Sequence, residues 1–231
     1  MSAARRLAAA AVVILVLAAP ARALAQAGAP PSREEALARL RGPDLEQRRE
    51  AAAWLAELGH MADVPALVHA LRDPDVLVRR LAQLAIWQVW CHSGDPGVDA
   101  LFQAGVAQMG RGDLDDATAT FSRIIERKPD FAEGWNKRAT VYFLAGEYEK
   151  SLRDCDEVMK RNPLHFGALS GYGQIHLRLG DPEKALPYFE RALAINPTLG
   201  QVEAVIEQLK RLIKEQRKPE ARARADGRDL G

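Results

Sequence analysis

The chain has 231 residues, of which 27% are charged, and its formal net charge is +1. This near-neutral balance argues against a nucleic-acid-binding protein, which needs a strongly basic face. The length allows either one continuous solenoid of repeats or two small domains.

Residues 1–25 have the features of a secretory signal peptide. Arg5 and Arg6 form a positive region, and residues 7–19 are a continuous apolar run. Small residues end the segment, so we expect cleavage after Ala25 and a periplasmic or secreted bacterial protein. Removing the segment removes three of the 32 basic residues and no acidic residue, which leaves a net charge of −2. The alternative is an uncleaved membrane anchor, although the apolar run is short for a bilayer span.

A linker is predicted at residues 26–32, and a repeat of 31 residues follows it. The motif Leu-Arg-Gly-Pro-Asp at 40–44 recurs as Leu-Arg-Asp-Pro-Asp at 71–75, and the Arg pair at 48–49 recurs at 79–80. Each copy predicts a helix, a Pro-Asp turn and a longer helix, with Asp44 and Asp75 as N-caps. Residues 33–92 resemble HEAT-like repeats of the phycobilisome-lyase type. That resemblance implies a scaffold and not the lyase activity of some relatives.

A second period, of 34 residues, covers 98–131, 132–165 and 166–199. Turn glycines recur at 112, 146 and 180, and prolines recur at 129, 163 and 197. Each copy predicts a helical hairpin whose second helix ends before the proline. Small residues at 105, 139 and 173 should let the two helices approach closely. Phe121, Cys155 and Phe189 should then fill the gap from the second helix. Hairpins of this length stack, because none buries its apolar face alone.

These residues resemble the tetratricopeptide repeat. The aromatic, small and Tyr positions of its first helix appear as Trp135, Ala139 and Tyr142, and its Ala-x3-Phe motif appears as Ala185 and Phe189. Arg138 departs from the family pattern, which favours Leu there. The resemblance implies an all-α fold, a right-handed α-solenoid in which two HEAT-like repeats precede three tetratricopeptide repeats. We expect roughly eleven helices, judged from hairpin count and period.

The C-terminal end completes this scheme. Residues 200–217 carry an apolar stripe at helical spacing, which predicts the capping helix that terminal repeats require. Residues 218–231 are rich in Arg, Ala and Gly without an apolar pattern, and we expect them to be disordered.

No residue set predicts catalysis. The sequence lacks a Gly-rich phosphate loop with Lys, a His-Glu-x-x-His motif and a Gly-x-Ser-x-Gly motif. The five His residues lack the spacing of a metal site. We therefore expect no enzyme activity, no metal and no cofactor. Cys155 replaces a core Phe, so we expect it to be a buried thiol and not the partner of Cys91 in a disulfide.

The predicted function is binding. First helices of stacked hairpins line a concave surface, and here they offer amide, cationic and aromatic side chains to a peptide or protein partner. We expect an exported, non-enzymatic adaptor. The alternative is a structural assembly factor of the cell envelope that works through its outer faces and the HEAT-like pair. We expect no nucleic-acid partner, and membrane contact only through an uncleaved N-terminus or the basic tail. The predicted partner-binding residues are Phe102, Val106, Asn136, Lys137, Thr140, Phe143, Ser170, Gln174 and Arg178.

Family members that grip the C-terminal carboxylate of chaperones use Lys, Asn and Arg on these first helices. Of the matching positions in this chain, only Lys137 holds a suitable side chain. The chaperone-clamp function is therefore not expected.

Overall fold

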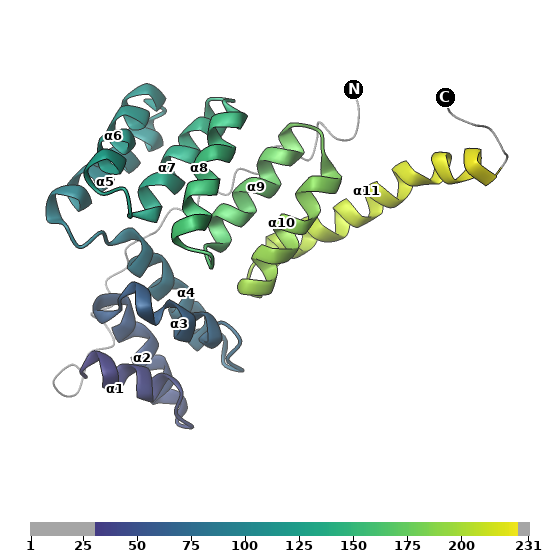
Figure 1. Ribbon diagram of the computed structural model, residues 1–231. Coiled ribbons are helices and arrows are strands. Elements are labelled where there is room, and N and C mark those ends of the chain that lie inside the picture. The colour runs from purple at the N-terminus through teal and green to yellow at the C-terminus, as the bar shows by residue number, and fades with distance from the viewer. Residues whose placement is uncertain (1–30, 226–231) are drawn as a thin grey trace. The chain divides into compact units, whose positions relative to one another are not determined.

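A computed structural model describes residues 31–225, with side chains for residues 31–216 (Figure 1). The expected signal peptide and residues 26–30 of the expected linker lie outside this range. Within it, the chain forms eleven α-helices, one short 3-10 helix and no strand. The predicted all-α fold of helical hairpins is confirmed. No helix in the described part is both long and apolar enough to span a membrane.

The described residues fall into two compact units divided between Gln103 and Ala104. We call residues 31–103 the N-terminal unit and residues 104–225 the C-terminal unit. The division falls within one helix, α5 (Pro96–Arg111).

The N-terminal unit consists of two helix pairs and the start of α5. Its elements are α1 (Arg33–Leu40), α2 (Leu45–Leu58), the 3-10 helix η4 (Met61–Asp63), α3 (Val64–Ala70) and α4 (Val76–Cys91). The predicted N-caps are confirmed. The Asp44 carboxylate accepts a hydrogen bond from the backbone N–H of Gln47 at 2.8 Å, and that of Asp75 accepts one from Val78 at 2.9 Å. Leu55, Leu67 and Ile86 are among the fully buried side chains, so apolar burial holds the two pairs together.

The C-terminal unit stacks the long hairpins. After α5 come α6 (Leu114–Arg127), α7 (Ala132–Leu144), α8 (Tyr148–Arg161), α9 (Phe166–Arg178), α10 (Pro182–Ile195) and α11 (Gly200–Ala225). The turn glycines Gly112, Gly146 and Gly180 have φ angles of 82°, 79° and 79°. Side chains with a Cβ rarely adopt that left-handed conformation, which explains why glycine ends each first helix.

Complementary small and large residues set the spacing within each hairpin. A Cβ added at Gly105 would lie 2.8 Å from the Phe121 ring, and one added at Gly173 would lie 2.6 Å from the Phe189 ring. In the middle hairpin, Ala139 shares a buried cluster with the small thiol of Cys155. The predicted close approach of the paired helices is therefore confirmed.

Helix α11 covers the last hairpin. Ile206 and Leu209 pack with Ala185 and Phe189 of α10, as a capping helix should. The helix then continues to Ala225, beyond the expected end at residue 217 (Figure 1). The expectation of disorder from residue 218 is wrong for 218–225, where Ala and Arg have high helix propensity. Residues 226–231 lie outside the described part.

Candidate functional site

The candidate site lies on the first helices of the second and third long hairpins. The 34-residue period relates three positions on α7 to three on α9: Asn136 to Ser170, Thr140 to Gln174, and Leu144 to Arg178. The Arg178 guanidinium lies over the Phe143 ring, 5.6 Å from its centroid. The two helices therefore present one continuous surface. We call it the α7/α9 face and define it by Lys137, Thr140, Phe143, Leu144, Ser170, Gln174 and Arg178.

Two predicted site residues are not available to a partner. Phe102 is only 2% exposed, because burying a large aromatic side chain is favoured over leaving it in water. Asn136 is 9% exposed and is held inward, since its amide donates a hydrogen bond to the buried Glu133 carboxylate at 3.0 Å. Val106 is partly exposed on α5. Arg178 is exposed, and the other five predicted residues are partly exposed.

Leu144 belongs to the face, although it was not among the site residues predicted from the sequence. Its side chain is 43% exposed, and it lies seven residues after Lys137 on the same stripe of α7. Leu144 also precedes Arg178 by one 34-residue period. This spacing could have placed Leu144 on the face from the sequence alone. An apolar residue at the end of an amphipathic helix is, however, more often assigned to the core.

A buried carboxylate lies under the face. The Glu133 side chain is inaccessible to solvent, and it lies 2.8 Å from Nε2 of His165 and 3.1 Å from Nζ of Lys137. Burial alone would raise the pKa of Glu133, but Lys137, His165 and Asn136 outweigh it and lower the pKa to about 2. Glu133 is therefore ionised, and it holds the partly exposed Lys137 in place.

The same cluster connects the second and third hairpins. His165 is the N-cap of α9, where its Nδ1 atom accepts the backbone N–H of Ala168 at 2.9 Å. Nδ1 therefore carries no proton, and Nε2 must donate to Glu133. A first-turn residue of α7 and the cap of α9 are thus joined, which fixes the relative placement of the two helices that form the face.

The face offers several kinds of contact. The hydroxyls of Thr140 and Ser170 donate back to carbonyls of their own helices at 2.9 Å, so toward a partner they act as acceptors. The Gln174 amide has no hydrogen-bond partner among the described residues. It can therefore donate to and accept from a peptide backbone. Lys137 and Arg178 add positive charge, and Phe143 and Leu144 add apolar surface.

Arg138 lies beside this face and forms a network of its own. Its Nε and Nη2 atoms donate to the two carboxylate oxygens of Asp154 at 2.8 and 2.9 Å, and Nη1 donates to the Ser122 hydroxyl at 2.9 Å. The guanidinium also lies 5.1 Å from the Trp135 ring centroid and 5.7 Å from that of Tyr142. Where the family favours Leu, this chain therefore has an Arg whose hydrogen-bond partners lie on α6 and α8.

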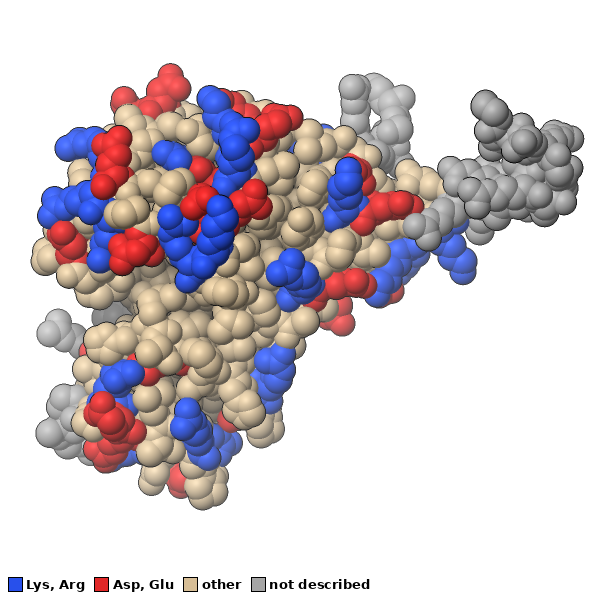
Figure 2. All heavy atoms as spheres, viewed as in Figure 1, with Lys and Arg blue, Asp and Glu red and all other residues tan. Residues whose placement is uncertain are grey.

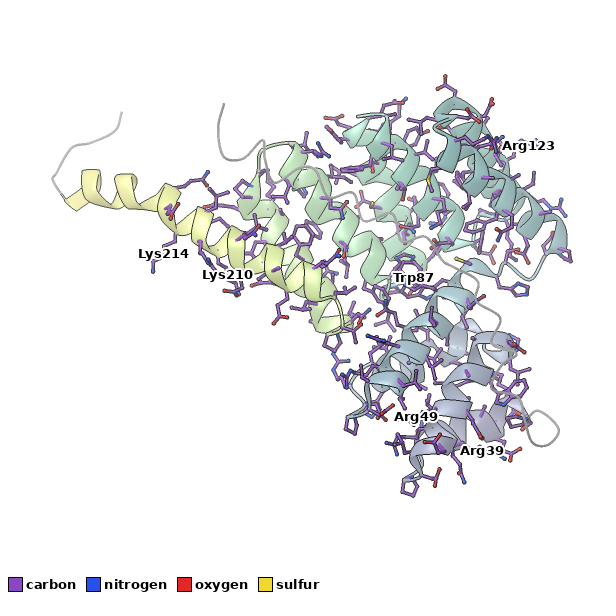
Figure 3. The ribbon with its side chains drawn as sticks, turned by 180° about the vertical axis from the view of Figure 1, so that it is seen from behind. Arg39, Arg49, Trp87, Arg123, Lys210 and Lys214 are labelled. Carbon is purple, nitrogen blue, oxygen red and sulfur yellow. The ribbon has the colours of Figure 1, made fainter. Side chains whose placement is uncertain are left out.

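Another surface lies between α10 and α11. A shallow depression of about 290 Å³ is lined by Leu186, Lys210, Ile213 and Lys214. Figure 3 shows Lys210 and Lys214 on successive turns of α11. The apolar stripe at residues 200–217 predicted a capping role for this helix.

The described residues carry no group of three or more His, Cys, Asp or Glu placed to bind a metal. Cys155 is 2% exposed, and burial raises the pKa of its thiol to about 12. Its expected place in the core is confirmed, and its thiolate is not available as a nucleophile. On the face shown in Figure 2, basic and acidic side chains are interspersed.

The fold and this face define a repeat scaffold of stacked helical hairpins. Family models of the tetratricopeptide repeat match residues 99–130 and 130–198. Residues 99–198 therefore consist of tetratricopeptide repeats, as the sequence predicted. The HEAT-like assignment of residues 33–92 stays a prediction.

Several known proteins have sequences similar to part of this chain. A TPR repeat-containing protein of Rhizobium etli is 35% identical over 126 residues, which are 54% of this chain and 61% of that protein. Anaphase-promoting complex subunit 7 of Dictyostelium discoideum is 36% identical over 76 residues, 33% of this chain and 13% of that protein. The alignments thus span less than two thirds of either relative.

Among solved structures, the TPR domain of Sgt2 from Aspergillus fumigatus has a similar fold. It aligns with a TM-score of 0.51 and 22% identity, over 54% of this chain and 83% of that one.

Proposed function

We propose that the protein is an exported, non-enzymatic adaptor that binds a peptide or protein partner on the α7/α9 face. The observation that carries this proposal is the continuity of the face: Arg178 of α9 lies over Phe143 of α7, and the buried Glu133 holds Lys137 on the same helix as Phe143. A rigid surface with cations, a free amide and exposed apolar side chains suits an extended or helical peptide.

The arrangement suggests how such a peptide binds. The Gln174 amide hydrogen-bonds its backbone, and Phe143 and Leu144 receive an apolar side chain. Lys137 and Arg178 favour an acidic group next to that side chain. Because the cluster beneath the face is already formed, little conformational entropy is lost on binding.

A pull-down from the native cell envelope tests the proposal. The test variant is Lys137→Ala/Phe143→Ala/Arg178→Ala, and the matched control is Arg153→Ala/Arg191→Ala, which removes exposed side chains of α8 and α10. Truncating residues central to an interface typically costs about 2 kcal/mol or more, roughly thirtyfold in affinity. We expect the triple variant to lose its partners and the control to keep them. Recovery of the same partners at the same yield by both variants would exclude this face.

Export rests on the N-terminal sequence, and the mass of the mature protein tests it. Purified from the native source, the chain should begin at Gln26 and fractionate with the periplasm or the medium. A mature protein that retains residues 1–25 would favour the anchored alternative.

The second candidate function, an assembly factor acting through other surfaces, is favoured by apolar exposure in the N-terminal unit. Leu77 and Leu84 of α4 are 37% and 49% exposed. If Leu77→Ser/Leu84→Ser removes partners that the triple variant retains, this candidate replaces the adaptor.

A further inference from the structure

Two arginine–aspartate contacts join the 31-residue copies of the N-terminal unit. Arg48 Nε lies 2.8 Å from a carboxylate oxygen of Asp73. Arg49 holds both oxygens of Asp75, through Nε at 3.1 Å and Nη2 at 2.8 Å. Figure 3 labels Arg49 on α2. The arginine pair of the first copy thus binds the acidic turn that begins the second helix of the next copy.

The bound turn is preorganised. Asp73 accepts the backbone N–H of Asp75 at 2.8 Å, and Asp75 accepts the N–H groups of Leu77 and Val78 at 3.0 and 2.9 Å. The Arg49 guanidinium is the main cause that lowers the pKa of Asp75. An Asp-x-Asp turn at a helix start is therefore a rigid ligand whose two carboxylates are held by backbone N–H groups, and the arginine pair matches it.

Arg79, the first arginine of the second pair, is anchored to a turn in the same way as Arg48. Arg48 Nη1 donates to the carbonyls of Gly42 and Pro43 at 3.3 and 2.9 Å. One period later, Arg79 Nη1 donates to the carbonyls of Asp73 and Pro74 at 2.7 and 3.0 Å. The 31-residue register is thus reproduced in the hydrogen bonds.

Arg80, the equivalent of Arg49 in the second copy, nevertheless has no acidic partner in the described part of the chain. It is exposed and makes no hydrogen bond or ion pair with any described residue. One 31-residue period after Asp73 and Asp75, the chain has Ala104 and Val106 inside helix α5. No acidic turn therefore follows to bind Arg80 as Asp75 binds Arg49. Within the first copy, Glu46 also pairs with Arg49 at 2.7 Å, whereas the equivalent of Glu46 in the second copy is Leu77. Arg80 therefore has no acid from its own helix to compete with a partner.

Apolar side chains flank this arginine. Leu77, Arg80 and Leu84 follow one another at i, i+3 and i+7, so they lie on one stripe of α4. In the first copy, the same stripe carries Glu46 and Ala53. In the first copy this stripe therefore carries an arginine that is paired with an acid. In the second copy it carries an unpaired arginine between two leucines.

We propose that Arg79 and Arg80, with Leu77 and Leu84, form a docking site for a partner protein that presents an Asp-x-Asp turn at the start of an amphipathic helix. The turn binds as Asp73-Pro74-Asp75 binds to Arg48 and Arg49, and the helix that follows packs an apolar residue against Leu84. The chain thus carries its own example of the contact. This site shares no residue with the α7/α9 face, and its test does not depend on that face.

Fluorescence anisotropy with the full chain tests the proposal. The probe is a labelled synthetic peptide of residues 70–82, which contains the acidic turn, and the control peptide carries Asp73→Asn/Asp75→Asn. The test protein variant is Arg80→Glu, and the matched control is Arg41→Glu, another exposed arginine of the same unit. Melting temperatures of both variants should match the parent chain, since neither arginine has a partner to lose.

We expect saturable binding of the peptide with the Asp-Pro-Asp turn, and this binding should weaken as salt screens the charges. Arg80→Glu and the Asn peptide should each weaken it about tenfold or more, and Arg41→Glu should change it by less than about twofold. Absence of saturable binding, or equal binding by Arg80→Glu, would overturn the proposal. Sedimentation that shows self-association of the full chain, lost in Arg80→Glu, would assign the site to a second copy and overturn the assignment to a partner protein.

Discussion

Replacing Asp154 by Ala should destabilise the protein, because the change strands Arg138. The side chains of Arg138 and Asp154 are 17% and 6% exposed, and two hydrogen bonds of 2.8 and 2.9 Å join them. Removing one partner of a fully buried ion pair costs about 3–5 kcal/mol, and the partial exposure of Arg138 reduces this. The remaining bond to Ser122 also satisfies one N–H. We therefore expect a loss of about 2–3 kcal/mol in the free energy of unfolding.

The double variant Arg138→Leu/Asp154→Ala shows whether the loss of stability comes from the unpaired arginine or from the loss of the Asp154 side chain itself. It restores the residue that the tetratricopeptide pattern favours and leaves no charge without a partner. Apolar replacement of a buried ion pair is often neutral or stabilising, so the double variant should lie within about 1 kcal/mol of the parent chain. Urea unfolding followed by circular dichroism measures both, provided the m-values agree. The reasoning is refuted if the double variant is as unstable as Asp154→Ala, or if the two single changes add.

Three further predictions follow from buried groups. Glu133→Gln should lose about 3 kcal/mol of stability at neutral pH, because the folded pKa of Glu133, about 2, lies below the ordinary 4.5. Unfolding measured over a pH series tests this. The difference in unfolding free energy between parent and variant should persist above pH 4.5 and shrink as the pH falls toward 2. A constant difference at all pH values would contradict it. Gly173→Ala should cost about 1–3 kcal/mol through overlap with Phe189, and a second change, Phe189→Leu, should recover part of the lost melting temperature. Cys155 should resist thiol reagents at about pH 8 while the partly exposed Cys91 reacts, and mass spectrometry of the labelled native protein decides this.

The two sequence periods predicted most of the local structure, because helix ends depend on nearby residues. Turn glycines and Asp caps act within a few positions, so Gly112, Asp44 and Asp75 could be placed without any tertiary information. The extent of α11 was less predictable, since Ala- and Arg-rich sequence without an apolar stripe is compatible with helix or disorder.

The candidate site was predicted less well, because exposure depends on what lies beyond a single hairpin. A helical wheel shows that Phe102 and Asn136 point away from the partner helix. It does not show that Phe102 is covered or that Asn136 turns toward Glu133. The Arg138 network was missed for a similar reason, since its partner Asp154 lies 16 residues away on another helix.

The matched residues at the centre of each hairpin determine which parts of the chain could be exchanged. A chimera that paired α7 with α10 would set Ala139 against Phe189, where even one added carbon overlaps the ring. The reverse chimera, α9 with α8, would set Gly173 against Cys155 and leave a void. Neither helix is therefore interchangeable alone, and duplication or recombination that preserves packing has to copy whole hairpins.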